Sequence, residues 1–435
     1  MISDKAKSYD EVFVWIWLPG KVEPVVAGKL TAQGKTLVFN YGKSYLERND
    51  AIAIFDPELP LRAGLLPLLP GMSMPSCLRD AAPDAWGRRI IINKILGAQG
   101  KGLDVSQLDE LTYLLHSGSD RIGALDFQLS PVNYEPRSPA NASLEELLEA
   151  TERVEKGLPL SPELNQALNH GTSIGGARPK ALIEEDNTKY IAKFSLQADL
   201  YSVVKAEFVA MRLAHLAGLN VAPVSLTRSS NKDVLLIERF DRVLSQKGWQ
   251  RKCMVSVLTL LELDEMMARY ASYENLSEII RSRFTDASAT LKELFGRITF
   301  NILAGNTDDH ARNHAAFWDG KMLQLTPAYD ICPQNRTGNE ASQAMLIEGN
   351  NRMSKISSCL DAAYIYFLSE KDALAIVAQQ LNAIAENWQL VCQQADLTDV
   401  DKKFMLGRQL LNSYAFDDLQ GERNYLQDIA NSVLY

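Results

Sequence analysis

Short apolar runs separated by turn residues dominate the first 70 positions of the chain. EVFVWIWL, KTLVFNY and AIAIF are continuous or alternating apolar runs bounded by Gly, Lys and Asn. Such runs are typical of β-strands, so we predict a β-rich segment over residues 9–70. The segment 71–130 predicts loops and short helices, among them PDAWGRRIIINKIL and LDELTYLLHSG.

A Pro-, Ser- and Asn-rich stretch, SPVNYEPRSPANAS (130–143), follows and predicts a linker. It ends in Ser143, and Glu146 completes the capping-box pattern that begins a helix. Between 170 and 265 the pattern returns to strands, because ARPKALIE and KYIAKFS flank the turn EDNTK, and PVSLTRS and KDVLLIERFD come later. The helix VKAEFVAMRLAHLAG lies among these strands and ends at Gly218.

From residue 266 onward, apolar residues recur mostly at i, i+3 and i+4, which predicts helices. One strand pair is expected near 314–326. A β-rich lobe followed by a helical lobe defines an α+β fold. We divide the chain into a β-containing domain with its linker (1–140), a strand-rich region (141–265) and a helical region (266–435).

Composition narrows the classes of protein to consider. The 435 residues are 46% hydrophobic and 23% charged, with a net charge of −9. This balance argues against a wholly basic surface for nucleic acid, although it leaves room for a local basic patch. The chain has no apolar run long enough for a membrane span and begins with no signal-peptide pattern. Its five widely spaced cysteines fit reduced thiols in a cytoplasm better than a zinc site.

The first candidate for chemistry is the glycine-rich segment HGTSIGGARPK (170–180). Its glycines allow the backbone to approach a ligand closely, and the N–H groups of such a loop can cradle phosphates. Arg178 and Lys180 add positive charge. Since the segment matches neither of the common phosphate-loop patterns, a plain surface loop is the alternative.

Two charged residues lie in apolar surroundings. Lys193 alternates with Ala192 and Phe194 in the strand YIAKFS, so it faces away from them and could reach a nucleotide phosphate. The alternative is a solvated strand lysine. Glu207 lies in an apolar helical stripe, where an acid needs a partner. We expect Lys193, as in the lysine–glutamate pair of kinases, with a structural arginine as the alternative.

The most specific pattern is GNTDDHARNHAAFWDGKMLQLTPAYD (305–330). Asp308 and Asn313 have the spacing of the catalytic aspartate and metal-binding asparagine in a kinase catalytic loop. Asp308 would accept a proton from a hydroxyl group. Asp309 is a second candidate for this role, but the spacing to Asn313 favours Asp308. A polar loop with an ordinary hairpin is the alternative.

The residues after this loop predict a hairpin that completes a metal site. HAAFW and KMLQL flank an Asp-Gly pair, which is a strong hairpin signal. We expect the hairpin to bring Asn313 opposite about Thr326, with Asp330 just beyond. An amide oxygen and a carboxylate are suitable ligands for Mg²⁺.

A different interpretation takes His310 and His314 as zinc ligands, because a helix would align residues four apart. The glutamate of the HExxH motif is absent, with Ala311 in its place. The following residues also predict a strand, which would break the alignment. We expect His310 to orient the loop, as the histidine of a kinase catalytic loop does.

Together these motifs resemble the HipA family of serine/threonine kinases, the toxins of type II toxin–antitoxin modules. PDAWGRRI (83–90) and GSDRIGAL (118–125) look like the family's N-terminal motifs, and TSIGGARPK resembles its phosphate loop. YIAKF, KAEFVAMRLA, LLIERFDR and NTDDHARN…LTPAYDI resemble its kinase core. The resemblance spans most of the chain and implies a small β-containing domain joined to a two-lobed, lipid-kinase-related core. Residues 141–265 would then be N-lobe-like and residues 266–435 the C-lobe.

The resemblance also implies roles for the matching residues. Asp308 would be the catalytic base, Asn313 and Asp330 would hold Mg²⁺, and the backbone of 238–240 would be the hinge that reads adenine. ATP would be bound by the set Ser173, Ile174, Gly175, Gly176, Ala177, Lys180, Lys193, Glu207, Glu238, Arg239 and Phe240.

Ser173 matches the family's autophosphorylated serine. A phosphoserine carries about −1.5 to −2 charges, so it would repel ATP phosphates from the loop that must hold them. We therefore expect phosphorylation of Ser173 to expel the loop and switch the kinase off. Pro179 is a departure from better-known members and removes one backbone donor.

By resemblance, the partner would be a HipB-like helix-turn-helix antitoxin, through which operator DNA is mainly contacted in a nucleoid-associated complex. The expected substrate is an aminoacyl-tRNA synthetase, glutamyl-tRNA synthetase in the best-known case. A catalytically weak scaffold or a small-molecule kinase is the alternative. A basic cluster could face DNA or RNA, or be a solvated face; it comprises Arg239, Arg242, Lys247, Arg251 and Lys252.

Overall fold

The computed structural model divides the chain into two compact units. It describes residues 9–96, 108–137, 142–156, 158, 161, 164, 178–196, 199, 201–336, 338 and 340–434. The first unit comprises Met1–Phe194, Arg228–Val255 and Phe317–Lys321, and the second comprises Ser195–Thr227, Ser256–Ala316 and Met322–Tyr435.

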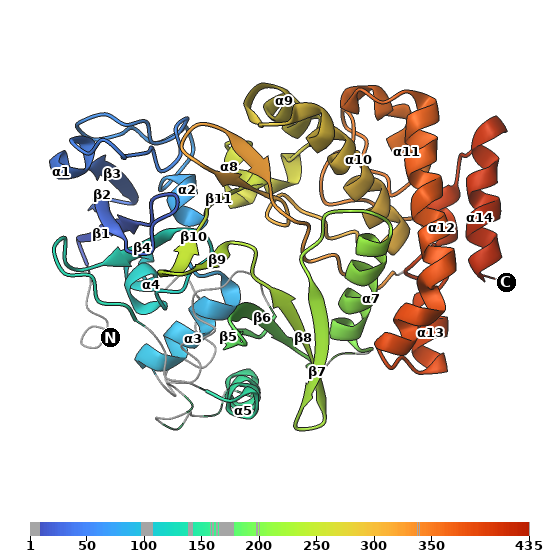
Figure 1. Ribbon diagram of the computed structural model, residues 1–435, viewed down its shortest axis with the longest axis horizontal. Coiled ribbons are helices and arrows are strands. Elements are labelled where there is room, and N and C mark those ends of the chain that lie inside the picture. Colours follow the sequence, from blue (N-terminus) through green and yellow to red (C-terminus); the bar gives the residue numbers. More distant parts are fainter. Residues whose placement is uncertain are drawn as a thin grey trace. The chain divides into compact units, whose positions relative to one another are not determined.

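Strands and helices are distributed as the predicted α+β class requires. Most of the described strands lie before residue 257, whereas helices dominate beyond residue 266 (Figure 1). Among the described residues, no helix is both long and apolar enough to cross a membrane. The division into 1–140, 141–265 and 266–435 remains a prediction.

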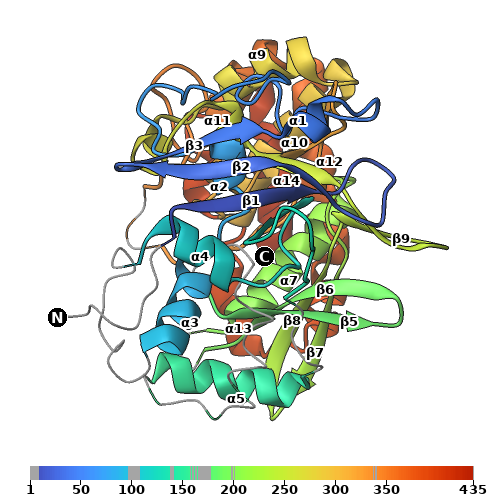
Figure 2. The ribbon, with the colours of Figure 1, turned by 90° about the vertical axis from the view of Figure 1, so that its left-hand side faces the viewer.

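The first unit begins with an antiparallel sheet of four strands in the order β3-β2-β1-β4 (Figure 2). The predicted runs EVFVWIWL and KTLVFNY are confirmed as strands, since they contain β1 and β3. The four strands are β1 (Glu11–Ile16), β2 (Val25–Gln33), β3 (Thr36–Tyr41) and β4 (Leu125–Gln128).

The third predicted strand, AIAIF (51–55), is wrong. Its apolar side chains are partly or fully buried, but Phe55 forms only an isolated bridge. Two tyrosine hydroxyls make the hydrogen bonds that a neighbouring strand would otherwise make. Ile54 N donates to the Tyr41 hydroxyl at 2.9 Å, and the Tyr45 hydroxyl donates to Ile52 O at 2.8 Å. Burial and backbone pairing are therefore satisfied without a sheet.

The predicted linker is packed against the first sheet over its described part, 130–137. The Tyr134 hydroxyl donates to Asp126 at 3.0 Å, and the Arg137 guanidinium donates to the same carboxylate at 2.6 Å. The Tyr134 ring also lies edge-on to Trp17. This part is thus a structural element of the first unit, while residues 138–141 lie outside the described residues.

The capping box that begins the next helix is confirmed. Helix α5 (Leu144–Glu155) begins after Ser143, whose hydroxyl accepts from Glu146 N, while the Glu146 carboxylate accepts from Ser143 N. One face of α5, including Leu147 and Leu148, packs on a second sheet. This contact fixes the sheet that carries the predicted nucleotide-binding strands.

The second sheet has the strand order β5-β6-β8-β7. The predicted hairpin between its first two strands is confirmed, and Asp186 and Asn187 form the turn with φ of 47° and 63°. Short polar residues tolerate this left-handed region best after glycine. The strands are β5 (Lys180–Glu185), β6 (Thr188–Phe194), β7 (Val224–Ser229) and β8 (Lys232–Glu238).

The predicted Asp-Gly hairpin is confirmed between β12 (Ala315–Trp318) and β13 (Leu323–Leu325). Its tip, Phe317–Lys321, belongs to the first unit. There Trp318 Nε1 donates to Ala53 O at 2.9 Å, and the Trp318 ring lies edge-on to Phe55.

The second unit is mostly helical. Its longest helix, α12 (Glu370–Gln394), packs against α7 (Val203–Leu216) and α14 (Tyr425–Leu434) (Figure 1). Helix α7 ends before Gly218, whose φ of 93° confirms the predicted glycine stop. The other helices of this unit are α8 (Val257–Leu260), α9 (Tyr273–Arg283), α10 (Ala287–Ala304), α11 (Ile356–Asp361) and α13 (Asp399–Met405).

The remaining elements are short. They are helices α1 (Lys43–Leu46), α2 (Ser76–Arg79), α3 (Ala85–Leu96) and α4 (Glu110–His116), strands β9 (Arg242–Ser245), β10 (Gly248–Arg251) and β11 (Cys253–Ser256), and 3₁₀ turns η4 (Glu265–Tyr270), η5 (Ala363–Tyr366), η6 (Ser413–Phe416) and η7 (Gly421–Asn424).

We expect Ser143→Ala to weaken the first turn of α5 by about 1 kcal/mol, because Glu146 N loses the hydroxyl that accepts its hydrogen bond. Amide hydrogen exchange over residues 144–148 should accelerate accordingly. Ser282→Ala, which removes an exposed hydroxyl inside α9, is the control and should leave exchange in α9 unchanged or slower. Equal effects of the two substitutions would contradict this role of Ser143.

Candidate functional site

The loop that follows α10 carries the predicted catalytic residues and begins with a tight turn at Gly305. This residue has φ of 70°, and a Cβ atom there would lie 2.3 Å from the backbone oxygen of Gln409. Only glycine avoids both the strain and the collision. The loop is therefore held against the 409 segment at its first residue.

Asp308 lies in the exposed part of this loop. Partial desolvation raises its pKa above the usual 3.8; nearby His310 opposes this shift, and the carboxylates of Asp330 and Asp309 add to it. The backbone oxygen of Asp308 accepts from His310 N at 2.8 Å, so the loop turns tightly behind the carboxylate. The structure thus presents one exposed carboxylate close to the carboxylate of Asp330.

Asp309, by contrast, points into the second unit and is 2% exposed. Its carboxylate accepts from the Tyr273 hydroxyl and from Asn301 Nδ2 at 2.8 Å. His314 Nε2 lies 2.9 Å from the other carboxylate oxygen. Asp309 therefore holds the loop from inside, which leaves Asp308 as the aspartate of the pair that can meet a substrate.

The same contacts overturn the zinc interpretation. His314 is 3% exposed, and its ring lies between Asp309 and the edge of Tyr273. Over the described ranges, no group of three or more His, Cys, Asp or Glu side chains is placed to hold a metal ion. His314 is a buried partner of Asp309 because the chain enters β12 there and does not continue as a helix.

Asn313 and Asp330 lie at the base of the hairpin. Asn313 Nδ2 donates to Asp308 O at 3.2 Å, so only the amide oxygen of this side chain can act as a metal ligand. Asp330 has φ of 60°, a left-handed conformation that costs about 1 kcal/mol or more outside glycine and often marks functional sites. Its backbone oxygen is within 3.5 Å of Asn306 Nδ2.

The hairpin register differs from the prediction by two residues. Thr326 N donates to Ala315 O at 3.0 Å, so Thr326 pairs with Ala315 and not with Asn313. The Tyr329 hydroxyl donates to Arg312 O at 2.7 Å and joins the two sides of the base. Neither contact could be read from the sequence pattern, since the turn signal fixes the tip of a hairpin better than its base.

In the first unit, Lys193 is a buried strand residue, and the alternative of a solvated lysine is wrong. It lies directly opposite Lys180 on the neighbouring strand, and each lysine is 6% exposed. Ala192 and Phe194 belong to the core beneath α5, so the lysines occupy the opposite face. Two like charges at one register position are unfavourable unless negative charge is near them.

Glu207 is 2% exposed on α7. It belongs to the second unit, whereas Lys193 belongs to the first, and the pairing of the two remains a prediction. Residues 173–177 of the glycine-rich segment, which include Ser173, Ile174, Gly175, Gly176 and Ala177, lie outside the described residues.

The segment 238–240 follows directly from β8. Arg239 N donates to Lys189 O at 2.8 Å on the neighbouring strand. Because successive N–H groups of an extended chain point to opposite sides, the backbone groups of Glu238, the last residue of β8, face away from β6. Phe240 lies in the turn that follows, and the hinge role of 238–240 remains a prediction.

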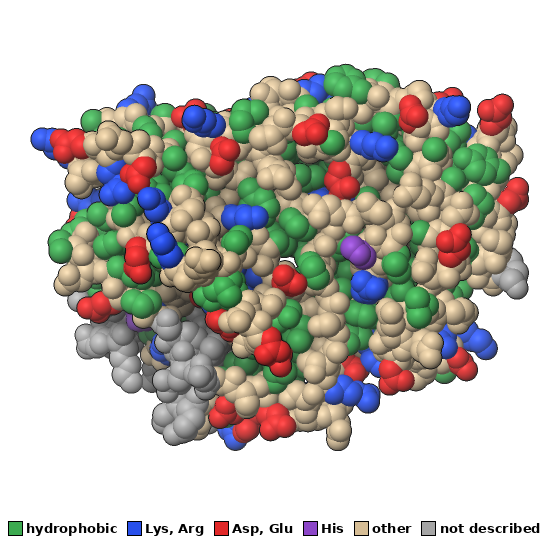
Figure 3. Space-filling view, in the orientation of Figure 1, with side chains coloured by type: hydrophobic (Ala, Val, Ile, Leu, Met, Phe, Trp, Pro, Cys, Tyr) green, Lys and Arg blue, Asp and Glu red, His purple; other side chains and the backbone are tan. Residues whose placement is uncertain are grey.

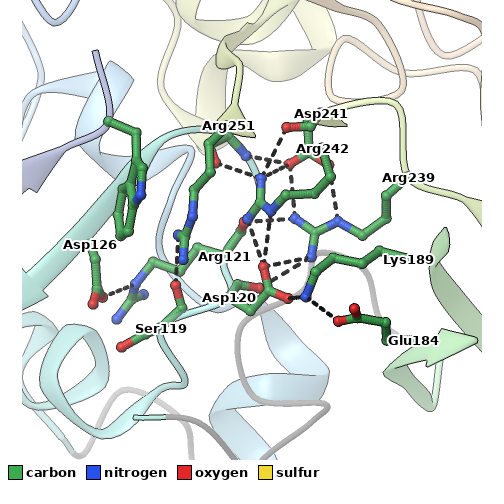
Figure 4. Close-up of polar contacts among 12 residues, drawn as sticks. Ser119, Asp120, Arg121, Asp126, Glu184, Lys189, Arg239, Asp241, Arg242 and Arg251 are labelled. Carbon is green, nitrogen blue, oxygen red and sulfur yellow. Dashed lines mark hydrogen bonds and ion pairs between the residues drawn. The ribbon is translucent and has the colours of Figure 1, made fainter. Parts of the chain in front are cut away.

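Arg239 itself is a correction to the predicted nucleotide-binding set. Its guanidinium has 0% side-chain exposure and is held by Asp120, Asp241 and the backbone oxygen of Arg121 (Figure 4). Its N–H is also committed to Lys189. Neither group can contact a nucleotide in this arrangement.

The five basic residues do not form one exposed face, because two of the arginines, Arg239 and Arg242, are buried. Arg242 is buried in the same ion cluster, and the Arg251 guanidinium stacks 3.5 Å from the Trp17 ring centroid. The Lys252 ammonium lies 4.5 Å from the ring centroid of Phe317. On the face seen in Figure 3, lysines and arginines are interspersed with acidic side chains. Of the five, Lys247 and Lys252 are exposed.

Sequence reasoning missed Asp120 and Asp241, the carboxylates that neutralise this cluster. The signal was present in GSDRIGAL and ERFDR, where acids and arginines occur in short apolar contexts. A buried arginine requires an acid, so a search for acids in equally apolar contexts would have found these two.

Two family models match most of the chain. The HipA-like C-terminal domain model matches residues 172–388, and the HipA N-terminal domain model matches residues 17–128. The chain therefore belongs to the HipA family.

Individual relatives are distant in sequence. The chain is 23% identical to a putative kinase, Y4mE, of Sinorhizobium fredii over 73% of this chain and 76% of that protein. It is 24% identical to the serine/threonine-protein kinase toxin HipA of Shewanella oneidensis over 33% of this chain and 36% of that protein. A putative kinase of Haemophilus influenzae is 25% identical over 42% of this chain and 61% of that protein.

A solved structure shows the fold. The chain matches HipA in a complex of HipA, HipB and operator DNA from Shewanella oneidensis MR-1 with a TM-score of 0.64 and 18% identity. The match covers 97% of this chain and 96% of that chain. The β-rich N-terminal domain and the helical C-terminal region are thus those of a HipA fold.

We expect the two neighbouring aspartates to differ in their effect on stability. Asp309→Ala should lower the free energy of unfolding by about 1–3 kcal/mol, because the Tyr273 hydroxyl and the Asn301 amide lose their acceptor inside the protein. Asp308→Ala should change it by no more than about 0.5 kcal/mol, since Asp308 is exposed. Urea unfolding of both variants tests this, and equal losses of stability would contradict the buried role of Asp309.

Proposed function

We propose that this chain is an ATP- and Mg²⁺-dependent protein serine/threonine kinase that acts as the toxin of a toxin–antitoxin module. The observation that carries the proposal is the arrangement around Asp308. The Asp308 carboxylate is exposed, Asn313 donates to its backbone oxygen, and Asp330 raises its pKa, while Asp309 anchors the loop from inside. The kinase names of the relatives support the same activity.

The donor set at the base of the hairpin fits Mg²⁺. Asp308 and Asp330 are close enough for the Asp330 carboxylate to raise the pKa of Asp308, and a divalent cation would relieve this repulsion. Asn313 would supply an amide oxygen and Asp330 a carboxylate oxygen, both of which are ligands for a hard cation. Bound Mg²⁺ neutralises the charge of ATP phosphates during transfer.

Each residue of the proposed site would then have a separate role in phosphoryl transfer. Asp308 orients the substrate hydroxyl and accepts its proton, and His310 closes the loop behind it through its backbone. Buried Lys193 and Lys180 supply positive charge for the phosphates, and Glu207 would hold Lys193. The backbone of Glu238 and Phe240 would read adenine. Catalysis by such a site is positioning and charge stabilisation.

Regulation is proposed from the sequence of the glycine-rich segment. Ser173 would be autophosphorylated, and its phosphate would compete with ATP for the same backbone donors, which switches the kinase off. Ser173, Ile174, Gly175, Gly176 and Ala177 would otherwise close over the ATP phosphates.

The proposed partners follow from the matched HipA–HipB–operator DNA complex. We propose a HipB-like helix-turn-helix antitoxin, with operator DNA contacted mainly through it. The proposed substrate is an aminoacyl-tRNA synthetase, with glutamyl-tRNA synthetase the first to try.

The test is the mass of the purified protein after dephosphorylation and incubation with Mg·ATP. The wild type should gain one phosphoryl group, located on Ser173 by peptide mapping. Asp308→Ala should gain none, because the proton acceptor is lost. Glu278→Ala removes an exposed carboxylate of α9 and should behave as the wild type.

Two outcomes would favour the alternatives. If the wild type gains no phosphate and Mg·ATP does not raise its melting temperature, the chain is a scaffold for its antitoxin and not a kinase. If it labels metabolites but no protein in an extract, a small-molecule kinase is the better assignment.

A further inference from the structure

A buried ion cluster joins the N-terminal domain to the end of β8, directly beside the proposed adenine hinge (Figure 4). All of its members belong to the first unit. The segment 119–126 lies in the HipA N-terminal domain match, whereas Lys189, Arg239 and Arg242 lie in the HipA-like C-terminal domain match. The cluster is thus a contact between two parts of the family's architecture.

Asp120 provides the N-terminal carboxylate of this cluster. One of its oxygens accepts from Arg239 at 3.0 Å and from Arg242 at 2.7 and 3.0 Å. The other oxygen accepts from Lys189 Nζ at 3.0 Å. Burial alone would raise the pKa of Asp120, but Arg239, Arg242 and Lys189 hold it well below its usual range. The carboxylate therefore stays ionised and joins three cations from three strands or strand ends.

Asp241 completes the cluster from the other side. It accepts from Arg239 at 2.9 Å on each oxygen and from Arg242 at 2.8 Å. It also accepts from Gly123 N at 2.8 Å, and Arg242 donates to Gly123 O at 2.9 Å. The loop that carries Asp120 is thereby bonded to the chain just after the hinge through both backbone and side chains.

The position of Arg239 gives the cluster a consequence for the hinge. Arg239 lies between Glu238 and Phe240, and its N–H is bonded to Lys189 on β6. Its side chain is clamped by Asp120 and Asp241. The orientation of Arg239 is therefore fixed by contacts of its backbone and of its side chain. Because neighbouring residues of an extended chain face opposite sides, this also fixes the direction of the backbone groups of Glu238, the last residue of β8.

We propose that Asp120 is a positioning residue for nucleotide binding: the N-terminal domain uses it to hold Arg239 and Arg242, and so to set the hinge. This inference rests on the proposed kinase function and adds to it that the affinity for ATP depends on the N-terminal domain. The contacts of Asp120 described above are with Lys189, Arg239 and Arg242, all in the first unit. Its loss should therefore weaken ATP binding more than it slows phosphoryl transfer.

The test compares Asp120→Asn with Asp126→Asn in the full-length, dephosphorylated protein. Asp126 is a buried carboxylate of the same domain, paired with Arg121 at 2.9 Å and Arg137 at 2.6 Å. Asp126→Asn leaves buried Arg121 without its carboxylate, and Asp120→Asn removes one of the two carboxylates that Arg239 and Arg242 share, so both should lower stability. Of these two carboxylates, Asp120 contacts Arg239 and Arg242, and Asp126 contacts Arg121 and Arg137. Asp126→Asn is therefore the matched structural control.

Two measurements separate affinity from chemistry. Calorimetry gives the dissociation constant for Mg·ATP, and the rate of Ser173 phosphorylation against ATP concentration gives half-saturation and maximal rate. For Asp120→Asn we expect the dissociation constant and the half-saturating ATP concentration each to rise at least about five-fold. The maximal rate should stay within about two-fold of the wild type. Asp120→Glu, which keeps the charge, should recover part of the loss. Asp126→Asn should leave the dissociation constant unchanged.

A second variant keeps the test decisive if Asp120→Asn fails to fold. Arg242→Lys retains a positive charge beside the two carboxylates but loses the forked contact with Asp120, and it should raise the dissociation constant roughly three-fold. The role of Asp120 is overturned if the dissociation constant is unchanged in whichever variant folds. It is also overturned if the dissociation constant rises equally in Asp126→Asn. Neither result affects the kinase proposal. A wild type that does not bind Mg·ATP would overturn both.

Discussion

The arrangement of the candidate active site depends on one buried carboxylate, that of Asp309. A carboxylate is costly to remove from water unless polar partners replace the lost solvation. The second unit provides these through Tyr273 on α9, Asn301 on α10 and His314 at the start of β12. Three elements are thereby tied to one residue of the loop, and the adjacent Asp308 is turned toward solvent.

The first unit uses the same physical solution with the signs reversed. Arg239 and Arg242 are buried cations, and Asp120 and Asp241 make their burial tolerable. In the second unit, buried polar contacts hold Asp309 beside Asp308, the proposed catalytic base. In the first unit, buried ion pairs hold Arg239 beside Glu238, a residue of the proposed hinge. Such networks give a well-defined geometry more than they give stability, and this geometry is what a phosphoryl-transfer site requires.

The sequence predicted those features that depend on local patterns. The capping box at Ser143, the turn at 186–187, the glycine stop after α7 and the Asp-Gly hairpin are each specified by a few adjacent residues. The spacing of Asp308 and Asn313 located the candidate site for the same reason, because the loop is continuous in the chain.

The errors concern contacts between distant segments. Residues 51–55 have the apolar pattern of a strand, but the hydroxyls of Tyr41 and Tyr45 satisfy their backbone from another segment. The basic residues after β8 look like a surface patch until Asp120, more than a hundred positions away, is placed against them. The hairpin register likewise depends on pairing at the base, which the turn residues do not specify.

The tip of the β12–β13 hairpin has a consequence for how this family can vary. The tip is packed on residues 53–55 of the N-terminal domain, through Trp318 and Phe55, although Asn313, the proposed magnesium ligand, precedes the same hairpin by only a few residues. The boundary between the two family domains in sequence is therefore not a boundary in space. An N-terminal domain exchanged between relatives would need residues that pack against this tryptophan as residues 53–55 do. The two domains are therefore expected to change together during evolution and not as independent modules.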